Sequence, residues 1–106
     1  MTDHPIDRLF KRIASRKGGD AKKSYTALLL KSGPAKCAKK FGEEAIETAL
    51  AAVKGDSEHV AAESADLIYH WLVLLAAAGV SLDDVAAKLE AREGISGIAE
   101  KAARKR

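Results

Sequence analysis

Apolar residues recur at helical spacing along most of this chain, and glycine, proline or capping residues separate the successive runs. A first helix is predicted from Ile6 to about Arg16, because apolar residues share one face there and Pro5 suits the first turn. Gly18 and Gly19 then end it. The next apolar piece, SYTALLLKSG, lies between polar flanks and is predicted to be a loop followed by a short helix.

The middle of the chain predicts two long helices joined by a very short turn. The first runs from Pro34 to Val53, because proline favours a helix start and Gly55 suits the position after a helix end. Asp56 and Ser57 are both good N-caps for the second helix, which continues to Gly79. Helices connected this closely pack antiparallel, so a helical hairpin is expected.

Two further helices complete the predicted architecture. Ser81 caps one of them, with two aspartates in its first turn, and a short, basic-ended helix follows a turn at GISG. The chain has 106 residues, is 47% hydrophobic and holds few aromatic rings, which suits one compact domain of helix-forming residues. The sequence therefore predicts a single all-α domain over 1–106, a bundle built on the hairpin and completed alone or with a second subunit.

Charge and cysteine content narrow the class of protein. A net charge of +3 is too small to indicate nucleic-acid binding without a basic cluster on one face. The lone Cys37 excludes an internal disulfide, and the first ten residues lack the layout of a secretory signal, so a reducing cytoplasm is expected. The longest apolar stretch, Leu67 to Val80, is shorter than the roughly 20 residues that span a bilayer, which predicts a buried helix and no membrane partner.

Acidic residues form a stripe along the first long helix. At about 100° per residue, Glu43, Glu44 and Glu47 fall on one side of it, and Lys36 and Lys40 project from the same stripe. Apolar residues fill the opposite side, so the acids are expected to border the core. These apolar residues are Phe41, Ala45, Ile46, Ala49, Leu50 and Val53.

The second long helix carries a narrower polar stripe on an otherwise apolar surface. His59, Glu63, Asp66 and His70 all lie within about 60° of one another on it. Burial of an ionised carboxylate costs several kcal/mol unless it is paired or bound to a metal, so Glu63 and Asp66 need a cationic partner. Lysines or a divalent cation could fill that role.

Two acidic pairs at i and i+3, on helices that pack antiparallel, can bring four carboxylates to one point. The pairs are Glu44 with Glu47 and Glu63 with Asp66. Oxygen ligands of this kind suit Mg²⁺, and a di-iron centre is disfavoured because it requires Glu-x-x-His. The alternatives without a metal site are a solvated acidic face on the first long helix and, for His70, the role of a hydrogen-bonded core histidine.

The order and spacing of several strings resemble the phosphoribosyl-ATP pyrophosphatase family over nearly the whole chain. They are SYTALLLKSG, GEEAIETALAAVKGD, ESADLIYHWLVLLAAAGVSLDDV and EGISG. That family is similar to the all-α nucleotide pyrophosphohydrolases, whose signature of Glu-Glu-x-x-Glu followed by Glu-x-x-Asp is present here. Its acidic positions in this chain are Glu43, Glu44, Glu47, Glu63 and Asp66.

The resemblance implies a reaction and roles for these residues. Glu44, Glu47, Glu63 and Asp66 are expected to bind Mg²⁺, while Glu43 or Glu47 orients or deprotonates the water that splits phosphoribosyl-ATP into phosphoribosyl-AMP and pyrophosphate. It further implies that Lys39 and Lys40 meet phosphate oxygens, that a homodimer completes the site, and that three residues line the nucleotide pocket. These three are Ser24, Tyr25 and Thr26.

Two other functions remain open on the sequence. A housecleaning pyrophosphohydrolase acting on other nucleoside triphosphates could share the same four acids, although SYTALLL and EGISG favour histidine biosynthesis. A non-enzymatic dimerisation or nucleic-acid-binding module could use Lys36, Lys39 and Lys40 with the basic tail. That module would bind nucleic acid with a steep salt dependence and would be indifferent to Mg²⁺.

Overall fold

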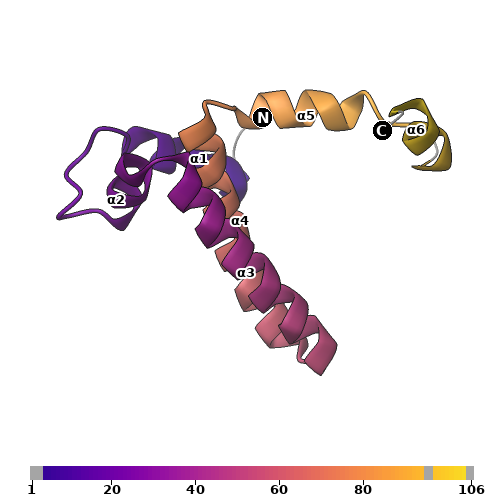
Figure 1. Cartoon of the computed structure of the whole chain (residues 1–106), viewed down its shortest axis with the longest axis horizontal. Coiled ribbons are helices and arrows are strands. Elements are labelled where there is room, and N and C mark those ends of the chain that lie inside the picture. Colours follow the sequence, from indigo (N-terminus) through magenta and orange to yellow (C-terminus); the bar gives the residue numbers. More distant parts are fainter. Residues whose placement is uncertain (1–3, 95–96, 105–106) are drawn as a thin grey trace.

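The computed structural model describes residues 4–94 and 97–104, and the fold class is all-α, as predicted (Figure 1). No strand occurs within these two ranges. The helices are α1 (Pro5–Ser15), α2 (Tyr25–Ser32), α3 (Pro34–Lys54), α4 (Ser57–Ala78), α5 (Leu82–Glu90) and α6 (Gly97–Arg104). Each expected helix is therefore confirmed, with bounds close to those predicted. The central residues of the expected GISG turn and the last two residues of the basic tail lie outside the described residues.

The centre of the fold is the hairpin of α3 and α4, whose mutual contact is the most extensive of any helix pair (Figure 1). Gly55 ends α3 in the left-handed conformation, at a φ of 76°, which glycine adopts without steric penalty. The Asp56 side chain immediately accepts a hydrogen bond from the His59 amide and so caps α4. Two residues thus reverse the chain, and the two long helices run side by side in opposite directions.

The core lies at the end of the hairpin where α1 and α2 pack against it. Its buried members come from four helices and are Ile13, Leu29, Cys37, Leu72, Val73 and Leu75. The Cys37 thiol donates to the Leu29 carbonyl over 3.3 Å, and burial raises its pKa. This residue is a small core side chain and not a reactive thiolate.

Helix α4 is long and apolar enough to cross a membrane, judged by length and composition alone. It nevertheless carries Glu63 and Asp66 near its middle and packs against α3, α1 and α2. Its most buried side chains, Leu72 and Val73, lie in the core that these helices share. We therefore interpret α4 as the central helix of the hairpin, in agreement with the buried helix predicted from Leu67 to Val80.

One prediction about α3 is wrong for the single chain. The apolar side opposite the acids does not face the core, because Ile46, Leu50 and Val53 are 63%, 53% and 84% exposed. The side turned inward instead holds the buried Cys37 and Ala51, seven residues to either side of Glu44. Helical periodicity separates two faces of a helix but does not say which of them meets α4, and here the acidic face does.

The C-terminal helices extend away from the hairpin (Figure 1). Ser81 and Asp84 form a capping box at the start of α5, and their two hydrogen bonds hold the pKa of Asp84 below its usual value. The radius of gyration is 15.9 Å, compared with about 13 Å for a compact domain of 100 residues. The chain is therefore elongated, with little of α5 packed on the body.

Candidate metal centre

Three carboxylates from the two long helices meet at one point. Glu44 of α3 and Glu63 and Asp66 of α4 each offer an oxygen, and these atoms all lie within 4.8 Å of one another. The arrangement follows from the hairpin, because antiparallel packing places the inward face of α3 opposite the polar stripe of α4. Three of the four carboxylates that the sequence predicts to converge are therefore brought together.

Lysine compensates the charge of this cluster only from a distance. Glu44 contributes to the raised pKa of Lys40, but the ion pair of Lys40 is with Glu43. Glu44 and Glu63 are partly buried, and Asp66 is exposed. Within residues 4–94 and 97–104, no lysine or arginine lies within ion-pair distance of these three acids. Like charges this close repel one another, and partial burial makes the repulsion costlier. A bound cation would remove that repulsion, and three hard oxygen donors fit Mg²⁺ better than a transition metal.

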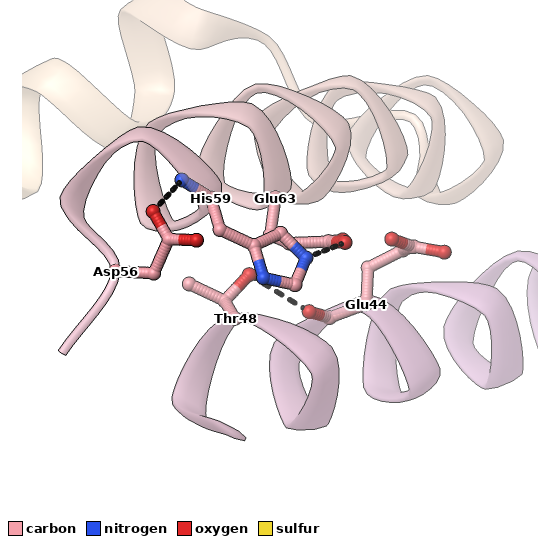
Figure 2. Close-up of polar contacts among 5 residues, drawn as sticks. All are labelled: Glu44, Thr48, Asp56, His59 and Glu63. Atoms are coloured by element: carbon pink, nitrogen blue, oxygen red, sulfur yellow. Dashed lines mark hydrogen bonds and ion pairs between the residues drawn. The ribbon is translucent and has the colours of Figure 1, made fainter. Parts of the chain in front are cut away.

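A histidine orients one of the three acids. His59 Nε2 lies 3.0 Å from Glu63 Oε2, and Figure 2 shows the Glu63 carboxylate held between this ring and Glu44. The His59 amide donates a capping hydrogen bond to the Asp56 side chain, which fixes the first turn of α4, where His59 lies. On α3 the Thr48 hydroxyl donates to the main-chain carbonyl of Glu44, a bond within the helix that leaves the Glu44 carboxylate unused (Figure 2).

The other two acids of the motif lie outside the cluster. Glu47 is exposed and is not among the three residues whose oxygens meet, although it follows Glu44 by one turn. Glu43 is also exposed and forms an ion pair with Lys40 over 3.4 Å. The structure thus divides the acidic motif into three parts: three convergent carboxylates, Glu43 paired with a lysine, and Glu47 outside the cluster.

Three rings extend the site along α4 toward α2. His70 is buried, and the rings of Tyr25 and Tyr69 meet it edge-on, with centroids 6.4 and 5.0 Å away. Burial lowers the pKa of His70, and Glu44 and Asp66 act on it in the opposite direction. The expected core location of His70 is confirmed, and its buried Nδ1 has no hydrogen-bond partner among the described residues.

Of the residues expected to bind substrate, Tyr25, Thr26 and Lys40 lie at or beside this ring cluster. Tyr25 is close enough to Lys40 to be the main cause of a raised lysine pKa, followed by Glu43. Two hydroxyls are already engaged: Ser24 caps α2 by accepting from the Ala27 amide, and Thr26 shares a hydrogen bond with the Tyr69 hydroxyl. Lys39 is exposed on α3.

Beside Tyr69 lies a pocket of 520 Å³. It is an open pocket lined by the C-terminal half of α1, the connection to α2, and residues of α2 and α4 that include Tyr69. Ser24 and Thr26, two of the three residues that the resemblance assigns to a nucleotide pocket, line it, while Tyr25 contacts the ring cluster instead. Burial raises the pKa of Tyr69 against the opposing effect of its bond to Thr26, so its hydroxyl remains protonated at neutral pH.

Comparison with known proteins decides the family. The sequence profile of "Phosphoribosyl-ATP pyrophosphohydrolase" matches residues 6–93, which is most of the chain. The chain belongs to the phosphoribosyl-ATP pyrophosphohydrolase family. This membership confirms the resemblance inferred from the sequence strings, and it makes the chain an enzyme of the hydrolase class. The non-enzymatic module considered above is therefore set aside.

Curated relatives of the phosphoribosyl-ATP pyrophosphohydrolase family are similar over nearly their whole length. A phosphoribosyl-ATP pyrophosphatase of Caulobacter vibrioides is 66% identical over 99 residues, covering 93% of this chain and 92% of its own. The protein of that name from Parvibaculum lavamentivorans is 62% identical, with 93% and 91% covered. The one from Dinoroseobacter shibae is 59% identical, with 93% and 97% covered.

The sequence reasoning did not anticipate every residue that lines this pocket. Tyr69 lines it and was not among the residues expected at a site, although its position one turn after Asp66 was an available signal. Arg12 and Arg16 also line the pocket. Their signal was two like charges one turn apart on the first helix, which is unfavourable for an isolated helix.

Proposed function

We propose that this chain hydrolyses phosphoribosyl-ATP to phosphoribosyl-AMP and pyrophosphate, the second step of histidine biosynthesis, in a reaction that depends on Mg²⁺. The observation that carries the proposal is the meeting of Glu44, Glu63 and Asp66 within 4.8 Å across the hairpin. The names of the curated relatives support the substrate. A carboxylate cluster without a lysine or arginine ion pair suits a reaction on an anionic phosphoanhydride that arrives with a cation.

The Mg²⁺ would be held by Glu44, Glu63 and Asp66. Glu47 would be the fourth ligand, with its side chain turned toward these three acids. When bound, the cation neutralises charge on the phosphate oxygens and acidifies water. The protein contributes orientation, because the hairpin fixes the acids relative to each other and His59 holds Glu63 in place.

Glu47 is the better of the two candidates for positioning or deprotonating the attacking water. Glu43 is held by Lys40, whereas Glu47 makes no ion pair or side-chain hydrogen bond in the described structure. Glu47 also follows Glu44 at i+3, which places it beside the cluster. Water bound there would have a carboxylate acceptor within reach, as general-base catalysis requires.

Lys39, Lys40 and the Ser24–Thr26 segment would meet the substrate. Lys40 stays cationic beside Tyr25 and Glu43, because both raise its pKa. Ser24 and Thr26 shape the wall of the pocket, and Tyr25 lies at the ring cluster between that pocket and the acids. We place this activity in the cytoplasm, where the single cysteine stays reduced, and expect neither nucleic acid nor membrane as a partner.

A homodimer would complete the fold. Ile46, Leu50 and Val53 form an exposed apolar face on α3, on the far side from the cluster, and the chain is too elongated to cover it. An exposed apolar stripe at i, i+4 and i+7 suits packing against a second helix. The same contact would remove apolar surface from water on both copies and support the hairpin that carries the acids.

Pyrophosphate release from phosphoribosyl-ATP by the purified protein, with Mg²⁺ or with a chelator, tests the proposal. The Glu44→Gln and Asp66→Asn variants should each lose at least about 100-fold in activity while keeping their helical content. Glu58→Gln, an exposed acid in the first turn of α4, serves as the matched control and should stay within about twofold.

The substrate panel decides between the two enzymatic readings. Other nucleoside triphosphates should be hydrolysed far less efficiently than phosphoribosyl-ATP. Release of pyrophosphate from simple triphosphates alone would replace the proposal by the housecleaning function, and release unaffected by chelator or by either variant would remove the metal site.

A further inference from the structure

The pocket beside Tyr69 has a cationic wall that the reaction chemistry leaves unused. Arg12, Arg16 and Lys23 line it, and Asp20 is the only acid among its lining residues in the described structure. The Asp20 carboxylate accepts a hydrogen bond from the Lys22 amide, which ties it to its own loop. Three cationic side chains against one carboxylate give the pocket a positive balance that favours an anion.

Repulsion between the two arginines is a cost of their placement. Arg12 lies in the last turn of α1 and Arg16 is the C-cap residue four positions later, and like charges at that spacing repel each other. Neither they nor Lys23 form an ion pair within residues 4–94 and 97–104. Two guanidinium groups that line one pocket, with no ion pair to the described part of the chain, suit the bidentate geometry with which arginine binds phosphate.

The pocket lining also offers neutral hydrogen-bonding groups. The Tyr69 and Thr26 hydroxyls are bonded to each other, so one of them keeps a proton that has no other partner among the residues that the structure describes. A volume of 520 Å³ lies within the range of small-molecule sites, about 300 to 1,000 Å³. A sugar phosphate fits this combination of cations and hydroxyls in one pocket lining.

The pocket adjoins the carboxylate cluster without containing it. Tyr69 follows Asp66 by three residues on α4, and side chains at that spacing lie about 5 to 6 Å apart. None of the three clustered acids lines the pocket. A ligand can therefore place its polyphosphate at the acids and a second anionic group at the arginines. The second group must then lie at another end of the molecule.

We propose that Arg12 and Arg16, with Lys23, bind the phosphate monoester of the substrate's phosphoribosyl group in this pocket. The inference rests on the proposed function and deepens it, because it assigns the two ends of phosphoribosyl-ATP to separate sites. The acids receive the triphosphate with its cation, and the pocket receives the monoester that is not cleaved. Discrimination against ordinary nucleoside triphosphates follows, since they have no second phosphate group to place there.

The test compares the double variant Arg12→Gln/Arg16→Gln with the matched double variant Lys17→Gln/Lys22→Gln. The latter removes the same charge from the same segment, but neither lysine lines this pocket. Loss of two charge-assisted contacts should raise the KM for phosphoribosyl-ATP at least about tenfold, with kcat within about threefold. The control should change both constants by less than about twofold.

Binding of ribose 5-phosphate to the wild-type protein provides a readout that needs no turnover. In a nuclear magnetic resonance titration without Mg²⁺, ribose 5-phosphate should shift the amide signals of Thr26 and Tyr69, and uncharged ribose should not. The arginine variant should lose this response and the lysine control keep it. A response in a protein that fails to hydrolyse phosphoribosyl-ATP would overturn the proposed reaction while leaving a sugar-phosphate pocket.

Other outcomes overturn the assignment itself. If inorganic pyrophosphate shifts these signals and ribose 5-phosphate does not, the pocket binds the polyphosphate instead. If the arginine variant lowers kcat with KM unchanged, the arginines act at the reacting phosphates and not at a remote group. If both double variants change KM equally, the arginines act only through long-range charge and do not bind the phosphate directly.

Discussion

His59 Nε2 and Glu63 Oε2 lie 3.0 Å apart, one turn from each other on α4 (Figure 2). This bond fixes the direction of the Glu63 carboxylate. His59 should therefore contribute to the Mg²⁺ affinity without contacting the ion. His59→Gln should weaken the apparent affinity for Mg²⁺ on the order of tenfold and leave kcat at saturating Mg²⁺ nearly unchanged. Activity measured across a Mg²⁺ titration checks this; an unchanged Mg²⁺ midpoint would show that the bond does not tune the site.

The two acids outside the cluster should differ in their effect on the reaction. Glu47→Gln should reduce kcat by about 100-fold or more, because it removes the carboxylate best placed to accept a proton from water. Glu43→Gln should cost less than about tenfold, since that side chain is engaged with Lys40. Single-turnover rates at saturating Mg²⁺ make the comparison, and the reverse ranking would transfer the role to Glu43.

The exposed face of α3 predicts the oligomeric state. The wild-type protein should have twice the 11.3 kDa mass of one chain, and Leu50→Asp should give the single-chain mass because a buried, unpaired carboxylate is costly. Leu28→Asp, at an exposed leucine of α2, is the control and should remain dimeric. Sedimentation equilibrium measures all three masses, and a wild type that is monomeric at micromolar concentration would rule this interface out.

Leu72 lies in the core with no exposed surface, so its truncation should be felt strongly. Leu72→Ala should lower the free energy of unfolding by about 2 to 5 kcal/mol, because it loses buried surface and leaves a cavity. Leu28→Ala, at 45% exposure, should cost less than about 1 kcal/mol. Urea denaturation at one fixed protein concentration gives both values, since a dimer's stability depends on concentration.

The buried His70 should make stability depend on pH. Burial lowers its folded-state pKa below the unfolded value of about 6.5, so the unfolded chain binds a proton that the folded chain does not. The stability from keeping the ring neutral is complete above about pH 6.5 and is lost as the pH falls toward the lowered folded value. His70→Met should flatten the fall in unfolding free energy between pH 7.5 and 5.5; equal slopes in both proteins would assign the pH dependence to other groups.

Local signals were sufficient to predict the helices and the hairpin. Gly55 and Asp56 end one helix and begin the next through interactions within a few residues, which the sequence states directly. Antiparallel packing brings Glu44 to the polar stripe of α4 once the face of α3 that holds Glu44 is the one turned toward α4. The convergence of most of the acidic motif could be predicted before any coordinates were known.

Features that depend on distant contacts could not be predicted in the same way. The orientation of the apolar side of α3 depends on what it packs against, and one chain supplies no cover for Leu50 or Val53. The pocket combines Arg16 of the first connection with Tyr69, more than fifty positions later, through the packing of α1 on α4. Helical periodicity describes each element separately, so it gives no information about such pairings.

The two-residue turn between α3 and α4 also limits how this chain can change in length. From Glu44 to Glu63 the backbone is continuous helix except for Gly55 and Asp56, which leaves no slack to absorb an added or deleted residue. One extra residue inside either helix would rotate everything beyond it by about 100° relative to the acid on the other side. Insertions and deletions should therefore be tolerated along the extended α5–α6 segment and selected against throughout the hairpin between its acids.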